Sequence, residues 1–363
     1  MSAVHSHSRI PKKPCNGCTC SIGLLSRQQR NKTLFRQISS QNRKSIVATG
    51  DNSDQYSVST TFLQCNSNKY VNTSKRLKEL RKEMYKADKT LVCYVVPSED
   101  EHFNEYTTFK EQRKSFISGF DGSAGVAVIS NNLSNLNIES HPEGKALLST
   151  DGRYFLQASQ QLDFNWQLNK QGVDTLTWQQ FCINECLENF NVFNLNKKED
   201  EFVKMKIGID PKLITYRDYE NLTSLISKQG HSDKIEVISI DENLVDLIWP
   251  LFEESPERVL KPITYLDERY TGQSFHQKKK TILKDLAGNE KTTKFVISKL
   301  DEICWLLNLR GSDIEYNPVF FAYLIIDGEE TILFTNNTID DSTMAVLLKN
   351  KIQVQRYQRV WLH

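Results

Sequence analysis

The sequence has almost no net charge, no long apolar run and none of the short signatures that mark common catalytic sites. Its 46 basic residues nearly balance 45 acidic ones, so no bulk electric field favours a nucleic acid or a membrane surface as partner. No stretch approaches the roughly 18 uncharged apolar residues of a membrane span. The first residues contain no apolar segment of the secretory type, so we expect no secretory signal. These absences indicate a globular protein whose 363 residues suffice for two domains.

The sequence contains eight cysteines, and several of them interrupt apolar strings. Cys93 lies in LVCYVV and Cys304 lies in EICWLL. A thiol in such a string behaves as a small apolar side chain. The pattern is typical of a reducing compartment and not of a disulfide scaffold, which favours a cytoplasmic location.

Residues 1–74 differ in composition from the rest of the chain. Residues 1–50 contain nine Lys or Arg and no acidic residue, together with many Ser, Asn and Gln. Such a segment buries too little apolar surface to offset the entropy of ordering it, so we predict a disordered basic arm. An acid-free start that contains Arg and Ser also has the composition of a mitochondrial transit peptide. Pro11 and Pro14 interrupt an amphipathic helix there, which favours the flexible arm.

The arm contains the cysteine cluster Cys15-x-x-Cys18-x-Cys20. Three close thiols in a reducing compartment can bind zinc, copper(I) or part of an iron–sulfur cluster. No fourth ligand is evident, although His5 or His7 can reach the cluster from a flexible chain. The alternative is a set of redox-accessible thiols that hold no metal.

Apolar periodicity from residue 75 onward predicts an α/β protein. Leu77, Leu80 and Met84 recur at helical spacing, and the continuous apolar run LVCYVV predicts a buried strand. Helical and strand patterns alternate from there to the strand KIEVISI. This alternation is typical of a central sheet covered by helices.

The same order of elements begins again near residue 258. Aligned by order, SFISGFDGS matches LLNLRGS, and the strands in AVIS and ALLSTDGR match those in AYLII and TILFTNN. We interpret this as an internal duplication. The sequence therefore predicts two related α/β domains in tandem, in residues 75–257 and 258–363.

No catalytic centre is recognisable from the residues alone. The seven histidines form no H-E-x-x-H pair, GFDGSAG is not a G-x-S-x-G nucleophile turn, and GSAGVAV lacks the lysine of a phosphate loop. We interpret the acidic runs SEDE and KKEDE as solvated faces. Trp249 and Trp305 are predicted to anchor a core or a domain interface.

Seven segments of the sequence resemble one peptidase family. They have the order and spacing of eukaryotic cytosolic Xaa-Pro aminopeptidases (aminopeptidase P) and cover roughly residues 76 to 358: FISGFDGSAGVAVI, STDGRYFLQA, GIDP, ENLVDLIW, YTGQSFHQK, LDEICWLLNLRGSDIEYNPVFFAY and ETILFTN. The resemblance implies two creatinase N-terminal-like domains followed by a catalytic pita-bread domain.

The resemblance also implies where the chemistry of this family lies. Members release an N-terminal residue that precedes proline, using two manganese ions. The metal ligands and the substrate-binding histidines lie in the pita-bread domain, which has no counterpart here. The resemblance therefore implies no catalytic residue, metal ligand or cofactor in the two folded domains, and no turnover by this chain alone. A homodimer is expected through the missing domain.

Arg153, in the string TDGRY, is the position for which the resemblance implies direct function. In this family the arginine of the string reaches the active site and binds substrate. A guanidinium is always charged, and its fork can hold a peptide carboxylate or carbonyl. The residues alone leave an alternative open, in which Arg153 is tied to Asp151 and braces the turn.

The last residues, KIQVQRYQRVWLH, correspond in the family to a position inside the second domain. We therefore expect a chain that is cut short, by a partial gene or a shifted reading frame. The second domain is then expected to be incomplete and marginally stable.

A second functional hypothesis comes from the arm. It is rich in Asn and Ser, a composition that resembles that of fungal proteins. The family also includes a fungal paralogue that acts in iron-responsive signalling. On this hypothesis the chain is a regulatory interaction protein whose arm and leading domains bind iron-signalling proteins.

Overall fold

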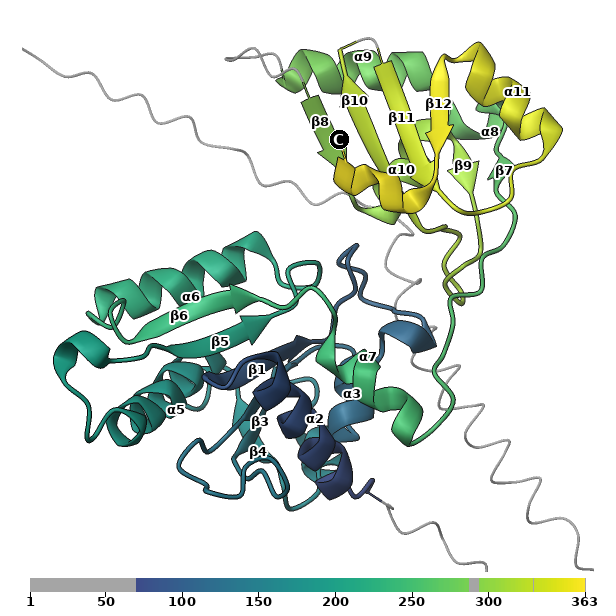
Figure 1. The fold of residues 1–363 in the computed structure, drawn as a ribbon. Coiled ribbons are helices and arrows are strands. Elements are labelled where there is room, and N and C mark those ends of the chain that lie inside the picture. Colours follow the sequence, from purple (N-terminus) through teal and green to yellow (C-terminus); the bar gives the residue numbers. More distant parts are fainter. Residues whose placement is uncertain (1–69, 287–293, 329, 363) are drawn as a thin grey trace, which may run out of the picture. The chain divides into compact units, whose positions relative to one another are not determined.

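The structure, a computed structural model, describes residues 70–286, 294–328 and 330–362 (Figure 1). The predicted arm, with Cys15, Cys18 and Cys20, lies outside the described residues. We call the elements from α2 to η3 (residues 74–251) the first domain and those from β7 to η4 (residues 264–362) the second domain. The linker is residues 252–263.

The first domain is built on a mixed sheet with strand order β4-β3-β2-β1-β5-β6. The strands are β1 (Leu91–Pro97), β2 (Val126–Ser130), β3 (Ala146–Thr150), β4 (Gln167–Lys170), β5 (Met205–Ile209) and β6 (Ile235–Ser239). Strand β1 is central, antiparallel to β2 and parallel to β5, and all seven of its residues are buried. This confirms the buried strand predicted from the apolar run LVCYVV.

Helices cover both faces of this sheet (Figure 1). Leu91, Tyr94 and Val96 of β1 belong to a core with α2 and α7, whereas Val92 and Val95 belong to a core with α5 and α6. The helices are α2 (Ser74–Ala87), α3 (Arg113–Ser118), α4 (Phe155–Gln161), α5 (Trp178–Phe193), α6 (Tyr216–Lys228) and α7 (Leu244–Ile248), with the 3₁₀ turns η1 (Phe109–Glu111), η2 (Glu199–Glu201) and η3 (Trp249–Leu251). A central strand therefore contributes to two separate cores, as expected of an α/β domain.

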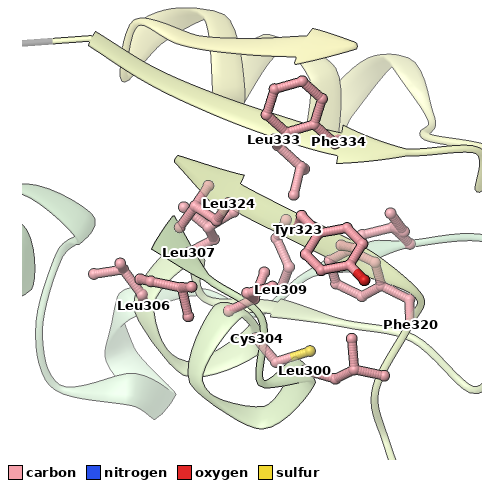
Figure 2. Close-up of a cluster of buried hydrophobic side chains, with 14 of the residues drawn as sticks. Leu300, Cys304, Leu306, Leu307, Leu309, Phe320, Tyr323, Leu324, Leu333 and Phe334 are labelled. Atoms are coloured by element: carbon pink, nitrogen blue, oxygen red, sulfur yellow. The ribbon is translucent and has the colours of Figure 1, made fainter. Parts of the chain in front are cut away.

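The second domain is built on a smaller sheet with strand order β12-β11-β10-β8. Its strands are β7 (Thr264–Tyr265), β8 (Lys294–Ile297), β9 (Leu309–Arg310), β10 (Ala322–Asp327), β11 (Glu330–Thr335) and β12 (Ile352–Gln355), and its helices are α8 (Glu268–Thr271), α9 (Phe275–Leu286), α10 (Leu300–Leu307), α11 (Asp341–Lys349) and the 3₁₀ turn η4 (Tyr357–Leu362). Leu306 and Leu307 of α10 pack with Phe320, Leu324 and other apolar residues in one core (Figure 2).

The two sheets share a four-strand unit. In the first domain β1 pairs antiparallel with β2, β2 pairs antiparallel with β3, and β3 pairs parallel with β4. The second domain repeats these pairings in the same chain order with β8, β10, β11 and β12. Repetition of both order and direction confirms the internal duplication, and among the described residues of the second domain β5 and β6 have no counterpart.

Two sequence interpretations are wrong. Trp249 is buried as predicted, but Trp305 is 49% exposed, because α10 directs its neighbours Cys304 and Leu306 into the core and Trp305 outward. The run SEDE is not a solvated face, since Asp100 is 2% exposed. In the part of the chain that the structure describes, no helix is long and apolar enough to cross a membrane.

Candidate functional site

Arg153 lies in a tight turn at the carboxyl end of β3. The strand ends at Thr150, and the backbone N–H of Tyr154 donates to the carbonyl of Asp151 (3.0 Å). The backbone N–H of Arg153 donates to Oδ1 of Asp151 (2.9 Å). An aspartate whose side chain accepts from the backbone two residues later is a standard turn-forming device. The turn directs the chain into α4 and leaves the Arg153 side chain 59% exposed.

The Arg153 guanidinium makes a forked contact with Asp151. Its Nε lies 3.0 Å from Oδ1 and its Nη2 lies 2.9 Å from Oδ2. Nη1 is 3.6 Å from Oε1 of Glu105, and the guanidinium lies 5.2 Å from the ring centroid of Tyr154. Hydrogen bonds from Arg153 hold the pKa of Asp151 below its usual range. The turn brace that the sequence left open is thus present, and substrate contact by the exposed arginine stays a prediction.

A glycine-rich loop, residues 119–125, packs against this turn. Ser123 Oγ lies 2.7 Å from the hydroxyl of Tyr154. Asp121 Oδ1 accepts hydrogen bonds from the Nε2 atoms of Gln157 (2.6 Å) and Gln161 (2.7 Å), both on α4. A pocket of about 150 Å³ opens beside the loop and is lined by Lys114, Glu105 and Ser123 among others. The loop and the arginine turn therefore form one surface.

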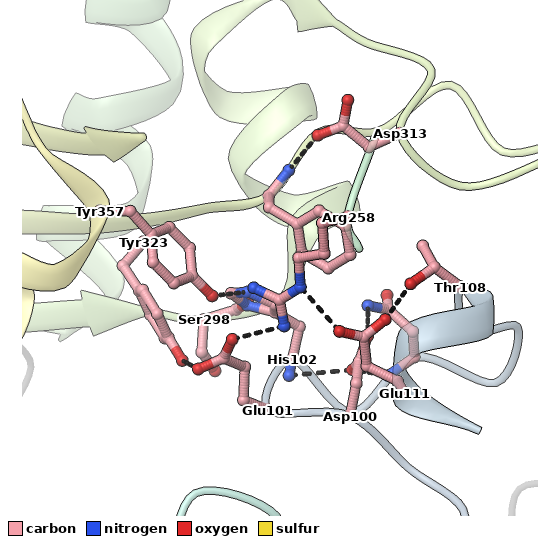
Figure 3. Close-up of polar contacts among 12 residues, drawn as sticks. Asp100, Glu101, His102, Thr108, Glu111, Arg258, Ser298, Asp313, Tyr323 and Tyr357 are labelled. Carbon is pink, nitrogen blue, oxygen red and sulfur yellow. Dashed lines mark hydrogen bonds and ion pairs between the residues drawn. The ribbon is translucent and has the colours of Figure 1, made fainter. Parts of the chain in front are cut away.

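A second polar cluster joins the two domains around His102 (Figure 3). His102 is buried, and one ring nitrogen, Nδ1, lies 2.7 Å from the carbonyl oxygen of Ser298 in the second domain. The other, Nε2, lies 2.6 Å from the hydroxyl of Tyr357 in η4. Burial lowers the pKa of His102, although Glu101 and Asp100 act in the opposite direction. A neutral imidazole suits this position, because it donates at one nitrogen and accepts at the other.

Arg258 connects the linker to both domains (Figure 3). Its Nη2 lies 2.7 Å from Oε1 of Glu101, and its Nε lies 2.7 Å from Oε1 of Glu111. The guanidinium lies 4.1 Å from the ring centroid of Phe321 in the second domain. Burial raises the pKa of Glu101, but the charge of Arg258 together with hydrogen bonds from Tyr357 and Arg258 and the charge of His102 outweighs burial, so the pKa lies below its usual value of 4.5. One cation thus holds two carboxylates of the first domain beside a ring of the second.

These joint residues were not predicted as a cluster. Arg258 and Glu101 are 157 positions apart, and His102 and Tyr357 are 255 positions apart. The only sign of this cluster in the sequence was that His102 directly follows an acidic run and has several aromatic residues close to it in sequence. Such a signal names no partner, so only the fold could supply the pairing.

The described residues offer no metal-binding cluster. Among residues 70–286, 294–328 and 330–362, no group of three or more His, Cys, Asp or Glu is placed to hold a metal ion. A cleft of about 530 Å³ adjoins the joint, and several carboxylates that line it are paired with arginines, as Asp246 is with Arg113 (2.8 Å). The donor set of the described part therefore does not fit a two-manganese site.

Two regions of the chain match family models described as the creatinase/prolidase N-terminal domain. One match covers residues 76–247 and the other covers residues 254–363. Each includes one of the two sheets described above.

Full-length relatives are about twice as long as this chain. The Saccharomyces cerevisiae protein named "Putative Xaa-Pro aminopeptidase FRA1" is 47% identical over 99% of this chain and 49% of its own length. The Coprinopsis cinerea protein named "Probable Xaa-Pro aminopeptidase P" is 42% identical over 81% of this chain and 42% of its own length. The chain thus spans about half the length of these curated relatives.

A solved structure shares the fold. It is the X-prolyl aminopeptidase of Caenorhabditis elegans, described as a cytosolic enzyme with a di-nuclear active site, and the likeness has a TM-score of 0.66 at 29% identity. The match covers 80% of this chain and 44% of the worm protein.

Proposed function

Because the chain belongs to the creatinase/prolidase N-terminal domain family and carries that domain twice, we propose that it forms the non-catalytic leading part of an Xaa-Pro aminopeptidase-like metallopeptidase. The complete enzyme would release the N-terminal residue of a peptide whose second residue is proline. Manganese would be bound by a further domain, through which two subunits would associate, and the protein would act in the cytoplasm. This chain spans about half of each relative, which supports a leading part without the catalytic domain.

The observation that carries the proposal is the exposed guanidinium of Arg153 at the end of β3. Asp151 holds the arginine through Nε and Nη2, while among the described residues Nη1 has only the exposed Glu105, at 3.6 Å, as a charged neighbour and the side chain as a whole is 59% exposed. A guanidinium can bind a peptide carbonyl or carboxylate without a change in its own charge. In the proposed enzyme Arg153 would hold and orient the substrate while the metal-binding domain carries out hydrolysis.

A chimera tests this role. The chain replaces the matching leading part of the worm X-prolyl aminopeptidase, and hydrolysis of an Xaa-Pro peptide is measured with manganese. A hydrogen bond to a charged group contributes about 1.5–3 kcal/mol, so Arg153→Ala is expected to lower kcat/KM about 10- to 100-fold. Arg153→Lys keeps the charge but loses the fork, so an intermediate loss is expected.

Arg217→Ala is the matched control, since Arg217 is an exposed arginine on α6. Arg153→Ala kinetics within twofold of this control would refute substrate contact. The isolated chain should hydrolyse no Xaa-Pro peptide with manganese, and measurable turnover would overturn its non-catalytic assignment.

A second function, a regulatory interaction in iron-responsive signalling, is favoured by one observation. The similarity to the yeast protein extends over 99% of this chain, whereas the similarity to the Coprinopsis protein covers 81%. The yeast match therefore includes sequence of the basic arm, where Cys15, Cys18 and Cys20 lie.

Partner capture with purified iron-signalling proteins tests this second function. Replacement of Cys15, Cys18 and Cys20 by Ser should abolish capture, and replacement of the arm's Ser6, Ser8 and Ser21 by Ala is the matched control. Capture that survives the cysteine replacements would count against a role for the cluster.

A further inference from the structure

Lys114 is a buried lysine with little to balance its charge. It lies on α3 and is 4% exposed. Its ammonium donates to the carbonyl oxygen of Gly122 and lies 4.2 Å from the ring centroid of Phe120. In the part of the chain that the structure describes, no carboxylate lies within ion-pair distance of Lys114. An ammonium has three donors, and the hydrogen bond to Gly122 is the one that ties it to the glycine-rich loop.

Burial lowers the pKa of Lys114 to about 7, while the more distant charges of Glu99 and Asp121 act to raise it. The carboxylate of Glu105 faces the same pocket. The side chain therefore changes charge in the neutral range. Because a charged donor makes a stronger hydrogen bond than a neutral one, its hold on the Gly122 carbonyl weakens as the pH rises through 7.

The loop that Lys114 holds is in direct contact with the arginine turn. A Cβ atom built on Gly122 would lie 2.8 Å from the Tyr154 ring and 2.3 Å from Phe120, so the loop backbone packs tightly against the residue that follows Arg153. The next residue of the loop, Ser123, hydrogen-bonds the Tyr154 hydroxyl. Movement at Gly122 must therefore be transmitted to Tyr154.

Asp121 adds a second connection from the loop. Its carboxylate accepts from two glutamines of α4, the helix that begins directly after Arg153 and Tyr154. The loop thus contacts the arginine turn in two places, at the Tyr154 ring and at α4. Lys114 lies at the opposite end of these contacts, where it fixes the loop backbone to α3.

We infer that Lys114 is a positioning residue for Arg153, acting through the Gly122 carbonyl and the glycine-rich loop to set the direction in which the guanidinium points. The biological value of this role rests on the proposed function of Arg153, but the coupling itself does not. Lys114 contacts Gly122 and Phe120 and makes no hydrogen bond with Arg153. It gives the orientation of Arg153 a dependence on pH near neutrality.

The coupling can be measured on this chain without a peptide. The side-chain Nε–Hε signal of Arg153 in a ¹H–¹⁵N spectrum, assigned with Arg153→Lys, is followed from pH 5.5 to 8.5. Carboxylates with ordinary pKa values are ionised throughout most of this range, whereas burial raises the pKa of Glu99. A titration with a midpoint near pH 7 is expected from Lys114. Lys114→Arg, which stays charged, and Lys114→Met, which is never charged, should both abolish the titration.

The two variants also separate positioning from simple stabilisation. The Arg153 signal of Lys114→Arg should stay near its low-pH position in the unmodified chain, and that of Lys114→Met should be displaced beyond its high-pH position. If Lys114→Met does not fold, Lys114→Arg decides alone. His102→Gln is the control for the nearest buried histidine in sequence and should leave the titration intact.

Other results would overturn the inference. They are an Arg153 signal that does not titrate near pH 7, a titration that persists in Lys114→Arg, or a titration lost in His102→Gln. Failure of the proposed function has a different signature, because the spectrum would titrate as expected while Arg153→Ala left peptide hydrolysis by the chimera unchanged.

Discussion

Removal of Arg258 should destabilise the joint between the two domains more than any loss of surface charge could. The Arg258 side chain pairs with Glu111, whose side chain is 1% exposed, and with Glu101, whose side chain is 11% exposed. In Arg258→Met the aliphatic stem remains, but both carboxylates lose their cation. Breaking a buried ion pair by removal of one partner costs about 3–5 kcal/mol, since an uncompensated buried charge is left.

Urea unfolding of the whole chain measures this cost. With an m-value of about 3 kcal/mol/M, at the upper end of the range for small proteins, the midpoint should fall by about 1–2 M. Arg217→Ala, at an exposed position of α6, should change it by less than about 0.2 M. Adding Glu101→Gln and Glu111→Gln to Arg258→Met should recover part of the loss, because no buried charge then remains. A shift for Arg258→Met no larger than that of the control would refute the reasoning.

The loss should also depend on pH with a definite sign. The pKa of Glu101 lies below its usual 4.5 in the folded chain, so its contribution to stability is present above pH 4.5 and is lost as the pH falls through the lowered pKa. Without Arg258, burial would raise that pKa instead. The difference between the two proteins should therefore be largest at pH 7 and shrink on acidification below about pH 5.

Three further substitutions test the joint and the glycine-rich loop by urea unfolding. Tyr357→Phe removes the hydroxyl that contacts His102 Nε2 and should cost about 1 kcal/mol, and no loss would argue against that hydrogen bond. Burial lowers the folded pKa of His102 below 6.5, so its neutral form contributes stability that is lost as the pH falls below about 6.5. His102→Gln should flatten this part of the profile, and an unchanged slope would contradict the burial of a neutral imidazole. Gly122→Ala should cost about 1–3 kcal/mol, because the added Cβ meets Phe120 at 2.3 Å. Gly152→Ala is the control for the loss of glycine, since its added Cβ meets only Phe155, at 3.8 Å.

The elements that the sequence predicted well are those whose apolar pattern is uninterrupted. The strands predicted in AYLII and TILFTNN are β10 and β11, which pair antiparallel. Helix α5, by contrast, was not predicted. Its buried face carries Glu185 and Asn189, which break the apolar periodicity. Glu185 is tolerated there because it accepts from Ser130 Oγ (2.8 Å) and pairs with Lys145, partners that no local pattern reveals.

In the candidate site, too, contacts between residues close in sequence could be predicted, and contacts between residues far apart in sequence could not. Arg153 was singled out only through the family resemblance, whereas its brace could be foreseen from the residues because Asp151 is two positions away. Glu101 was misread because its partner, Arg258, lies in the linker and is brought near only when both domains have folded. Acidic runs are exposed by default, and the sequence contains no mark that distinguishes one whose counter-ion arrives from far along the chain.

The duplication clarifies why one domain presents an arginine and the other does not. The third strand of the shared unit ends at Thr150 in the first domain and at Thr335 in the second, and each threonine hydroxyl donates to a backbone carbonyl beside the adjoining strand. After Thr150 the chain forms the exposed turn of Arg153. After Thr335, Asn337 is buried and binds Asp313 (2.8 Å) and the carbonyl of Lys261 (2.8 Å), so the same end of the sheet closes on the linker. One copy therefore leaves this end of the sheet exposed while the other uses it to fix the linker, so the two copies differ in the residues that follow the third strand.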